Sequence, residues 1–252
     1  MRAFMTGRVV LAGLALASAG LLCLGLAARA DEKKDEGPKP APKGAEVLFD
    51  GKDLSGWTSP DGKTAAEWNV EDGYMEVVPG KGDIKTKETF GPDFKLHVEF
   101  WLPLMADKKS QERANSGVYL QGRYEIQVLD SYKNETYEKG ECGAMYGILG
   151  TSKNANKPPE QWQTYDISFH APRVDDQGKV TEKGRLTVVF NGEKVIDDGK
   201  FDKVTGGAQD EEFGKPGPIR LQDHGCKVRY RNIWLKPLSG EKAERQGEEK
   251  GK

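Results

Sequence analysis

The sequence is poor in the residues that catalytic and metal centres most often use. It has three cysteines and three histidines in 252 residues. The histidines show neither H-x-H nor H-E-x-x-H spacing, so no local metal motif is present. No G-x-S-x-G elbow, phosphate-binding loop or dinucleotide fingerprint occurs either. The usual local signatures of serine hydrolases and nucleotide-dependent enzymes are therefore excluded.

Two further absences narrow the class of protein. The net charge is −2 and no basic stripe is present, which argues against nucleic acid as a partner. No stretch keeps a helical period over three turns, whereas short alternating segments with turn residues between them recur along the chain. This pattern predicts an all-β fold, a two-sheet antiparallel jelly-roll sandwich.

The N-terminus reads as an export signal. Residues 1–30 contain a basic start, a long apolar run and the motif Ala-Arg-Ala. We expect cleavage there, which predicts an exported, periplasmic or extracellular protein without a stable membrane anchor. The apolar run is also long enough to cross a bilayer, so an uncleaved anchor is the alternative. Cys23 as a lipoprotein site is disfavoured by the large Leu22 before it.

The remaining chain divides by composition. Residues 31–44 are charged and Pro-rich, which predicts an extended, disordered linker, and residues 239–252 predict a disordered tail. Residues 45–238 form one domain large enough for a proper core. Outside the cytoplasm Cys142 and Cys226 could pair, or both could be buried free thiols. The sequence leaves the oligomeric state open.

The central stretch of the domain is Asn115–Asp130. It predicts two short strands joined by a tight turn at residues 121–123. In the second strand, apolar side chains alternate strictly with Glu125 and Gln127. One face of this strand is expected to cover the core, and the other to offer a carboxylate and an amide.

All three histidines fall on the polar rows of predicted strands, near carboxylates or amides. These rows contain His97 with Glu99, Asp166 with His170, and Gln222 with His224. One hypothesis is a divalent metal bound by nitrogen and oxygen ligands. Its candidate ligands are His97, Glu99, Glu125, His170 and His224.

Two other hypotheses use the same rows. A pair of carboxylates such as Glu99 and Glu125 could perform acid–base chemistry on a glycosidic bond. A face with amides and aromatic rings could instead bind sugar, with Trp101, Tyr119 and Trp162 as candidate rings. For Trp57, Trp68 and Trp234 core packing is the expectation.

Four blocks of the sequence together carry a family resemblance. They are LFDGKDLSGW (48–57), NSGVYLQGRYEIQVLDSY (115–132), WQTYDISFHAPR (162–173) and LQDHGCKVRYRNIWLKPL (221–238). In this order, over about residues 46–238, they resemble the 3-keto-disaccharide hydrolase domain family. The resemblance implies a concanavalin A-like fold, an exported bacterial protein and activity on a carbohydrate substrate, a 3-keto-glycoside.

The implied chemistry needs a base for the acidic C2 proton, a donor or metal for the enolate oxygen, and an acid for the leaving group. No cofactor is certain, and a divalent metal is a candidate. The expected catalytic residues are Glu125, His224, His170 and Glu99. The expected substrate-binding residues are Gln127, Gln222, Arg123, Asn115, Tyr119, Trp101 and Trp162.

One departure from the family pattern bears on the cysteines. Cys226 stands where a polar residue is expected after the Asp-His-Gly turn, and with Cys142 it favours a disulfide. The alternative function is a non-catalytic, lectin-like carbohydrate-binding module, because the same fold hosts many binders. A cell-surface adhesion domain is a third hypothesis, against which the rows of histidine and glutamate argue mildly.

Overall fold

The computed structural model describes Met1 and residues 37–238. Apart from Met1, the predicted export signal lies outside the described residues, and so does the predicted tail at 239–252. Within the described part, no helix is long and apolar enough to cross a membrane.

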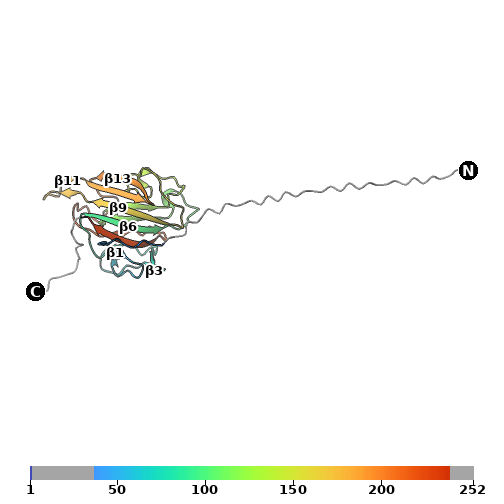
Figure 1. Cartoon of the computed structure of the whole chain (residues 1–252), viewed down its shortest axis with the longest axis horizontal. Coiled ribbons are helices and arrows are strands. Elements are labelled where there is room, and N and C mark those ends of the chain that lie inside the picture. The colour runs from blue at the N-terminus through green and yellow to red at the C-terminus, as the bar shows by residue number, and fades with distance from the viewer. Residues whose placement is uncertain (2–36, 239–252) are drawn as a thin grey trace. The chain divides into compact units, whose positions relative to one another are not determined.

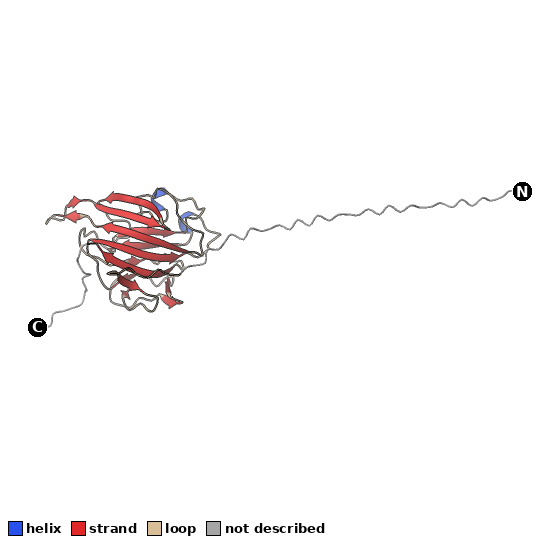
Figure 2. Ribbon diagram, in the orientation of Figure 1, coloured by secondary structure: helices blue, strands red, loops and turns tan. Residues whose placement is uncertain are grey.

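Two antiparallel sheets make up the domain (Figures 1 and 2). The larger sheet has the order β13-β12-β9-β6-β15-β4-β3, with β1 paired to β15, and the smaller has the order β2-β5-β14-β7-β8. A separate ribbon pairs β10 with β11. The strands of the larger sheet are β1 (Glu46–Phe49), β3 (Asn69–Glu71), β4 (Tyr74–Glu76), β6 (Asp93–Trp101), β9 (Trp162–His170), β12 (Gly184–Phe190), β13 (Glu193–Phe201) and β15 (Arg229–Pro237). The other elements are β2 (Trp57–Thr58), β5 (Ile84–Thr86), η1 (Ser110–Glu112), β7 (Asn115–Leu120), β8 (Tyr124–Leu129), η2 (Glu138–Gly140), β10 (Arg173–Val174), β11 (Val180–Glu182) and β14 (Arg220–Leu221).

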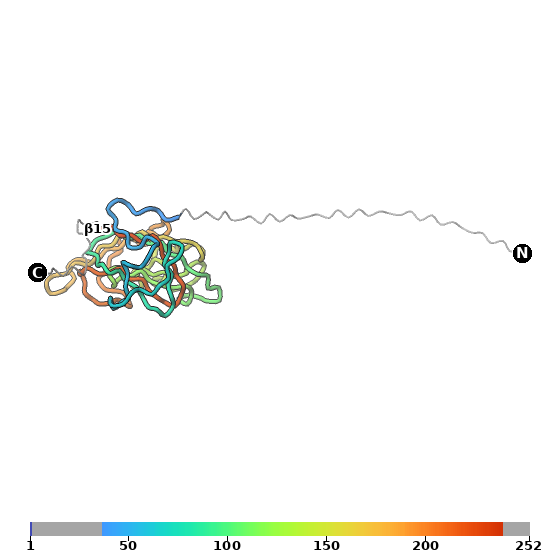
Figure 3. Tube along the Cα trace, turned by 90° about the horizontal axis from the view of Figure 1, so that it is seen from below, coloured from blue at the N-terminus to red at the C-terminus, as the bar shows by residue number. Residues whose placement is uncertain are grey.

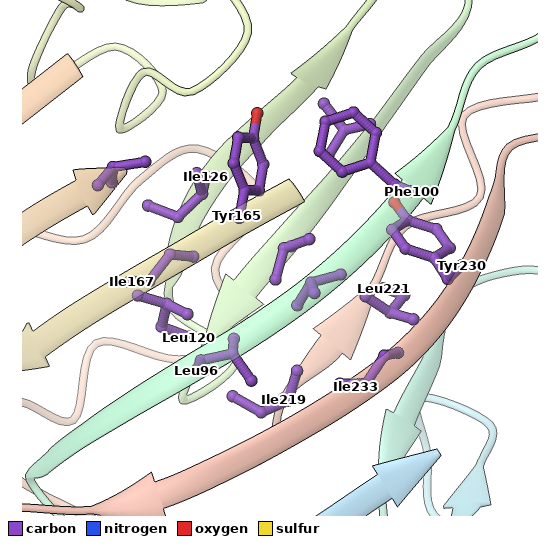
Figure 4. Close-up of a cluster of buried hydrophobic side chains, with 14 of the residues drawn as sticks. Leu96, Phe100, Leu120, Ile126, Tyr165, Ile167, Ile219, Leu221, Tyr230 and Ile233 are labelled. Carbon is purple, nitrogen blue, oxygen red and sulfur yellow. The ribbon is translucent and has the colours of Figure 1, made fainter. Parts of the chain in front are cut away.

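The core lies between the two sheets because the strands alternate as the sequence predicts. In Figure 4, Leu96, Phe100 and Tyr165 of the larger sheet face Ile126 and Leu221 of the smaller one. Phe100 and Tyr165 are fully buried, with ring centroids 4.7 Å apart. Each buried aromatic or aliphatic side chain of this kind stabilises the fold by roughly 1.5–3 kcal/mol. The fold is the predicted all-β, two-sheet antiparallel jelly-roll sandwich.

The tight turns follow from residues that tolerate positive φ. The β12–β13 hairpin turns at Asn191 and Gly192, with φ of 51° and 83°. The β7–β8 hairpin turns at Gln121 and Gly122, with φ of 52° and 67°. Phe190 pairs with Glu193 across a two-residue loop, and Leu120 pairs with Tyr124 across a three-residue loop, so the register of each hairpin is fixed by its turn.

Two predicted strands are shorter than expected. Of the predicted strand 219–224, only β14 pairs regularly, because the Asp223 carboxylate turns away to accept hydrogen bonds from the backbone amides of Gly80 and Gly82. The stretch 143–149 forms isolated bridges rather than a strand. Gly143 and Gly147 in it have positive φ, 88° and 69°, which interrupts extended pairing.

The end of the predicted linker is packed on the domain. The carbonyl oxygens of Lys39 and Lys43 accept hydrogen bonds from Asn232 and Lys236 of β15, at 3.0 and 3.2 Å. Figure 3 shows this first described segment beside β15. Residues 37–44 therefore lie against the larger sheet and are not a free linker.

The predicted disulfide between Cys142 and Cys226 does not form, since both cysteines are free. The Cys142 sulfur is buried and lies 3.0 Å from the Tyr165 hydroxyl. The Cys226 sulfur lies instead 3.7 Å from the Met105 sulfur. Each thiol thus packs in its own environment, and burial raises the pKa of Cys142 to about 12, which keeps it protonated.

Candidate functional site

The outer face of the smaller sheet gathers polar side chains from three adjacent strands. The register pairs Tyr119 of β7 with Glu125 of β8 on one side and with Arg220 of β14 on the other. One step along, Gly117 pairs with Gln127, and its carbonyl oxygen accepts a hydrogen bond from the backbone amide of Gln222. Because side chains two residues apart share a face, these residues form one patch, which we call the Glu125 face.

The Glu125 carboxylate is held at the centre of this face. Its Oε2 accepts a hydrogen bond of 2.9 Å from the Tyr119 hydroxyl. Its Oε1 lies over the backbone of Gly117, where an added Cβ would be 2.6 Å away. Among the described residues no hydrogen bond to Oε1 is formed, so this oxygen is the one available for chemistry.

Burial makes Glu125 unusually basic. The residue is only 4% exposed. Burial raises the pKa of Glu125 to about 7, and the Tyr119 hydrogen bond and the Arg220 charge offset only part of that effect. Burial, followed by the charge of Glu125, raises the pKa of Tyr119 far above its usual value, so the phenol stays a donor. A carboxylate that titrates near neutrality can both take and return a proton.

Two donor-bearing side chains lie beside Tyr119. The Arg220 guanidinium carbon is 3.8 Å from the centroid of the Tyr119 ring, and its Nε lies 3.6 Å from Asp83 Oδ2. Gln222 donates from Nε2 to the Tyr119 hydroxyl at 3.3 Å. Arg220 Nε and Gln222 Oε1 are buried and make no hydrogen bond within the described part of the chain. Arg220 Nε could therefore donate to an oxygen of a bound ligand, and Gln222 Oε1 could accept from a ligand hydroxyl group.

A chain of amides extends the same face toward the loop after β8. Gln127 Nε2 donates to Gln111 Oε1 at 3.0 Å, and Asn115 Nδ2 donates to the Gln111 carbonyl at 3.1 Å. Gln111 Nε2 in turn donates to Thr136 Oγ1 at 2.6 Å. Asn115 and Gln127, both expected to contact substrate, thus support this loop.

Arg123, also expected to bind substrate, forms hydrogen bonds within the protein. It is 2% exposed, its Nε donates to Asp210, and an NH group donates to the Lys215 carbonyl at 2.9 Å. The guanidinium therefore fixes the segment that crosses the end of the β7–β8 hairpin. Because Nε and Nη1 are engaged within the protein, the structure gives Arg123 a structural role, and its expected contact with substrate stays a prediction.

His224 lies exposed in the turn after β14. The backbone amide of Asp223, the residue before His224, donates to Asp83 Oδ1 at 2.9 Å, so the turn that carries His224 adjoins Asp83. Asp83 itself adjoins Arg220, so His224 stands at the border of the Glu125 face. No described contact joins His224 to Glu125.

The other four expected site residues lie on the outer face of the larger sheet, across the core. Glu99 accepts hydrogen bonds from Arg231 and Asn232 at 2.7 and 2.8 Å. His170 lies 3.3 Å from an Asp93 oxygen. The predicted grouping of these residues with Glu125 is wrong, because the two sheets expose opposite faces. The rings of Trp101 and Trp162 are on this second face too, where the guanidinium groups of Arg229 and Arg231 cover them at 4.4 and 4.0 Å.

His97 sits in a charged cluster on that second face. Its Nδ1 is 2.7 Å from Asp166 Oδ1, its Nε2 is 3.5 Å from Glu99 Oε1, and its ring stacks on Trp234 at 5.0 Å. Trp234 is therefore not a core residue, contrary to expectation. Burial alone would lower the pKa of His97, but the two carboxylates outweigh burial and raise it to about 9.

This cluster predicts a pH-dependent contribution to stability. The folded pKa of His97 lies above its unfolded value, so the contribution is complete below the unfolded pKa and disappears as pH rises through about 9. His97→Gln should lower the free energy of unfolding by about 2 kcal/mol near pH 6, and by much less above pH 9. Urea unfolding at both pH values measures this difference. His170→Gln, at a 39% exposed side chain, is the matched control and should change little. A His97→Gln effect of equal size at both pH values would contradict the assignment.

A divalent metal does not fit the Glu125 face. Within residues 37–238, no group of three or more His, Cys, Asp or Glu side chains could hold an ion. Near Glu125 the donors are one carboxylate, a phenol and amides, and the Arg220 guanidinium opposes a cation, whereas Ca²⁺ and Mg²⁺ take several oxygen ligands. Three of the five candidate ligands, His97, Glu99 and His170, lie on the opposite face. The side chains of the Glu125 face are therefore the groups that could supply chemistry there.

Two residues of the Glu125 face, Arg220 and Gly117, and two tyrosines of the adjoining loop are not among the site residues that the sequence predicts. Arg220 alternates with Gln222 and His224 along one predicted strand, and this shared polar row is the sequence feature that could have identified Arg220 as a site residue. Gly117 shows no sequence feature that reveals the carboxylate above it. Tyr137 and Tyr146 come from the loop after β8, and the amide of Tyr146 donates to the Glu125 carbonyl at 3.0 Å. Their position beside Glu125 depends on pairing between this loop and β8, which the sequence does not reveal.

Comparisons with known proteins agree with this fold. No curated protein matches the chain. A solved structure of a candidate glycosyl hydrolase from Parabacteroides distasonis ATCC 8503 is 41% identical, with a TM-score of 0.73, covering 79% of this chain and 85% of that one. A second candidate glycosyl hydrolase from the same organism is 21% identical, with a TM-score of 0.55 over 77% of this chain and 94% of that one, and supports the fold alone. The model of the 3-keto-alpha-glucoside-1,2-lyase-like domain matches residues 44–236, and the chain therefore belongs to that family.

Proposed function

We propose that this protein cleaves the glycosidic bond of 3-keto-glycosides, with Glu125 as the base that removes the C2 proton. The observation that carries the proposal is the buried Glu125 carboxylate with its pKa raised to about 7 and one oxygen free of hydrogen bonds among the described residues. The family and the 41% identical relative, both named for glycoside chemistry, support the substrate class.

The first step is proton abstraction. A ketone at C3 acidifies the C2–H bond, and Glu125 Oε1 takes this proton while the bonding electrons form the C2–C3 enolate. Arg220 Nε is a donor without a hydrogen bond among the described residues and is suited to stabilise the enolate oxygen, while Gln222 Oε1 can accept a hydrogen bond from a sugar hydroxyl group. Tyr119 donates to Oε2, and Oε1 accepts no hydrogen bond from the described residues, so Oε1 is the oxygen that takes the proton.

The second step is elimination. The enolate electrons form the C1–C2 double bond as the bond from C1 to the glycosidic oxygen breaks, and the leaving oxygen takes a proton from the protonated Glu125 or from His224 in the turn after β14. Stopping here gives a lyase product, a 1,2-unsaturated 3-keto sugar. Addition of water, with hydroxide at C1 and a proton at C2, completes a net hydrolysis.

The test is turnover of a panel of 3-keto-disaccharides by the purified mature domain, with and without chelator. Release of free sugar is expected in both conditions, because no step needs a metal. Release abolished by chelator would contradict the side-chain mechanism. Binding without release would instead favour the lectin-like module, whose fold is the same. Export to the periplasm or the extracellular space belongs to the same proposal and is tested by fractionation of the producing cells.

The pH profile gives a prediction that separates the candidate bases. With Glu125 as base, kcat/KM should fall about tenfold per pH unit below about 7 and level off above it, because the carboxyl must be ionised to accept a proton. His224→Ala should leave the midpoint of this profile unchanged. A midpoint that shifts or disappears in His224→Ala would assign the base role to His224 instead.

A further inference from the structure

The loop after β8 carries an exposed aromatic residue next to the Glu125 face. Tyr137 is 48% exposed, while Tyr119, the ring inside the face, is 1% exposed. A single exposed ring is ordinary on a protein surface, so only the contacts that hold Tyr137 can indicate a role for it.

The position of Tyr146 ties this loop to Glu125. Met145 forms an antiparallel bridge with Ile126, and the amide of Tyr146 donates to the Glu125 carbonyl. The Ile126 side chain is inward, so the neighbouring pair, Tyr146 and Glu125, points outward on the same face. Glu125 therefore stands between Tyr119 on one neighbouring strand and Tyr146 on the other.

Tyr146 in turn positions Tyr137. The two hydroxyl groups are hydrogen-bonded, and the ring centroids are 6.1 Å apart in an edge-on arrangement with an interplanar angle of 65°. The Tyr137 ring also rests on the backbone of Gly140, where an added Cβ would be 2.2 Å from the ring atom Cε2. The ring is thus supported on one side and bonded at its hydroxyl, and its exposed surface is presented to solvent.

The loop that carries the ring is fixed before any ligand arrives. Gln111 Nε2 donates to Thr136 Oγ1 at 2.6 Å and to the Gly140 carbonyl at 2.9 Å, on either side of Tyr137. Gln111 is itself held by Gln127, two residues from Glu125. A rigid aromatic ring with a fixed hydroxyl is suited to the C–H face and hydroxyl groups of a sugar ring, and loses little conformational freedom on binding.

We infer that Tyr137, supported by Gly140 and Tyr146, is a binding subsite for the sugar ring that leaves, next to the 3-keto ring at Glu125. The inference rests on the proposed function for the identity of the ring at Glu125. A subsite at Tyr137 would determine which leaving groups the enzyme prefers. Leaving groups that contain a pyranose ring would be favoured over small alcohols.

The experiment compares two substrates, a 3-keto-disaccharide and methyl 3-keto-glucoside, which has no second ring. Tyr137→Ala should raise KM for the disaccharide about tenfold and leave the methyl glycoside unchanged. Gly140→Ala, which pushes the ring from its place without removing it, should act in the same direction. Tyr137→Phe should retain most of the preference because it keeps the ring. Tyr132→Ala, elsewhere in the same loop, is the matched control and should behave as wild type.

Equal effects of Tyr137→Ala on both substrates would overturn the inference, since they would indicate damage to the Glu125 centre. If the wild-type protein turns over neither substrate, the proposed function fails, and the subsite is tested by saturation-transfer NMR with unoxidised disaccharides. Binding lost in Tyr137→Ala would then support a sugar site at this ring. Equal binding, or none by the wild-type protein, would overturn it.

Discussion

Glu125→Gln is expected to lower kcat/KM for a 3-keto-disaccharide by about a thousandfold, because it removes the base and keeps the shape. The amide can still accept a hydrogen bond from Tyr119, and the site is already buried, so the fold should be retained. Loss of a buried carboxylate whose pKa burial has raised should leave stability unchanged or slightly increased near neutral pH. Steady-state kinetics and thermal unfolding measure the two quantities.

The matched control is Glu99→Gln, which removes a carboxylate from the outer face of the other sheet. It should retain wild-type turnover, since Glu99 contacts Arg231 and Asn232 and is separated from Glu125 by the core. Undiminished turnover by Glu125→Gln would contradict the assignment of Glu125 as the base. Loss of turnover in Glu99→Gln with the fold intact would restore the grouping that the structure rejects.

Gly117→Ala is expected to lower kcat about a hundredfold, because a displacement of about 1 Å at a reacting group can cost that much. The new Cβ would lie 2.6 Å from Glu125 Oε1 and 3.1 Å from Cδ, so the carboxylate must move. Gly117 does not have positive φ, and alanine is compatible with its strand conformation. The effect should therefore appear in kcat and in the pH midpoint before it appears in stability.

Gly56→Ala controls for a glycine replacement without a close contact, since its nearest neighbour would be 3.9 Å away. It should show wild-type kinetics. A Gly117→Ala enzyme with unchanged kcat would show that the carboxylate can reorient freely, and the positioning role of Gly117 would be withdrawn.

The sequence predicts the fold well because alternation and turn residues are local signals. Strict alternation in β8 placed Glu125 and Gln127 on one face, and residues such as Asn191 and Gly192 marked the hairpins. The same signals could not decide which strands are neighbours. Alternation predicts that a side chain points away from the core. Because a sandwich has two outer faces, alternation does not predict on which of them the side chain lies.

This ambiguity explains the errors in the candidate site. Glu99 and His170 alternate as cleanly as Glu125 does, yet they belong to the larger sheet. The predicted disulfide is wrong for a related reason. An oxidising compartment permits a disulfide, but it does not determine the distance between Cys142 and Cys226. Tyr146 could be placed beside Glu125 only by pairing across an irregular, glycine-interrupted segment.

The hydrogen-bonded link from Gln127 through Gln111 to Thr136 has a kinetic consequence. It joins the strand that carries Glu125 to the loop that carries Tyr137, so this strand and this loop are already held together in the free protein. A ligand then needs no loop-closing step before chemistry. Association should follow a single exponential whose rate rises linearly with substrate concentration, without the plateau that a preceding conformational change imposes.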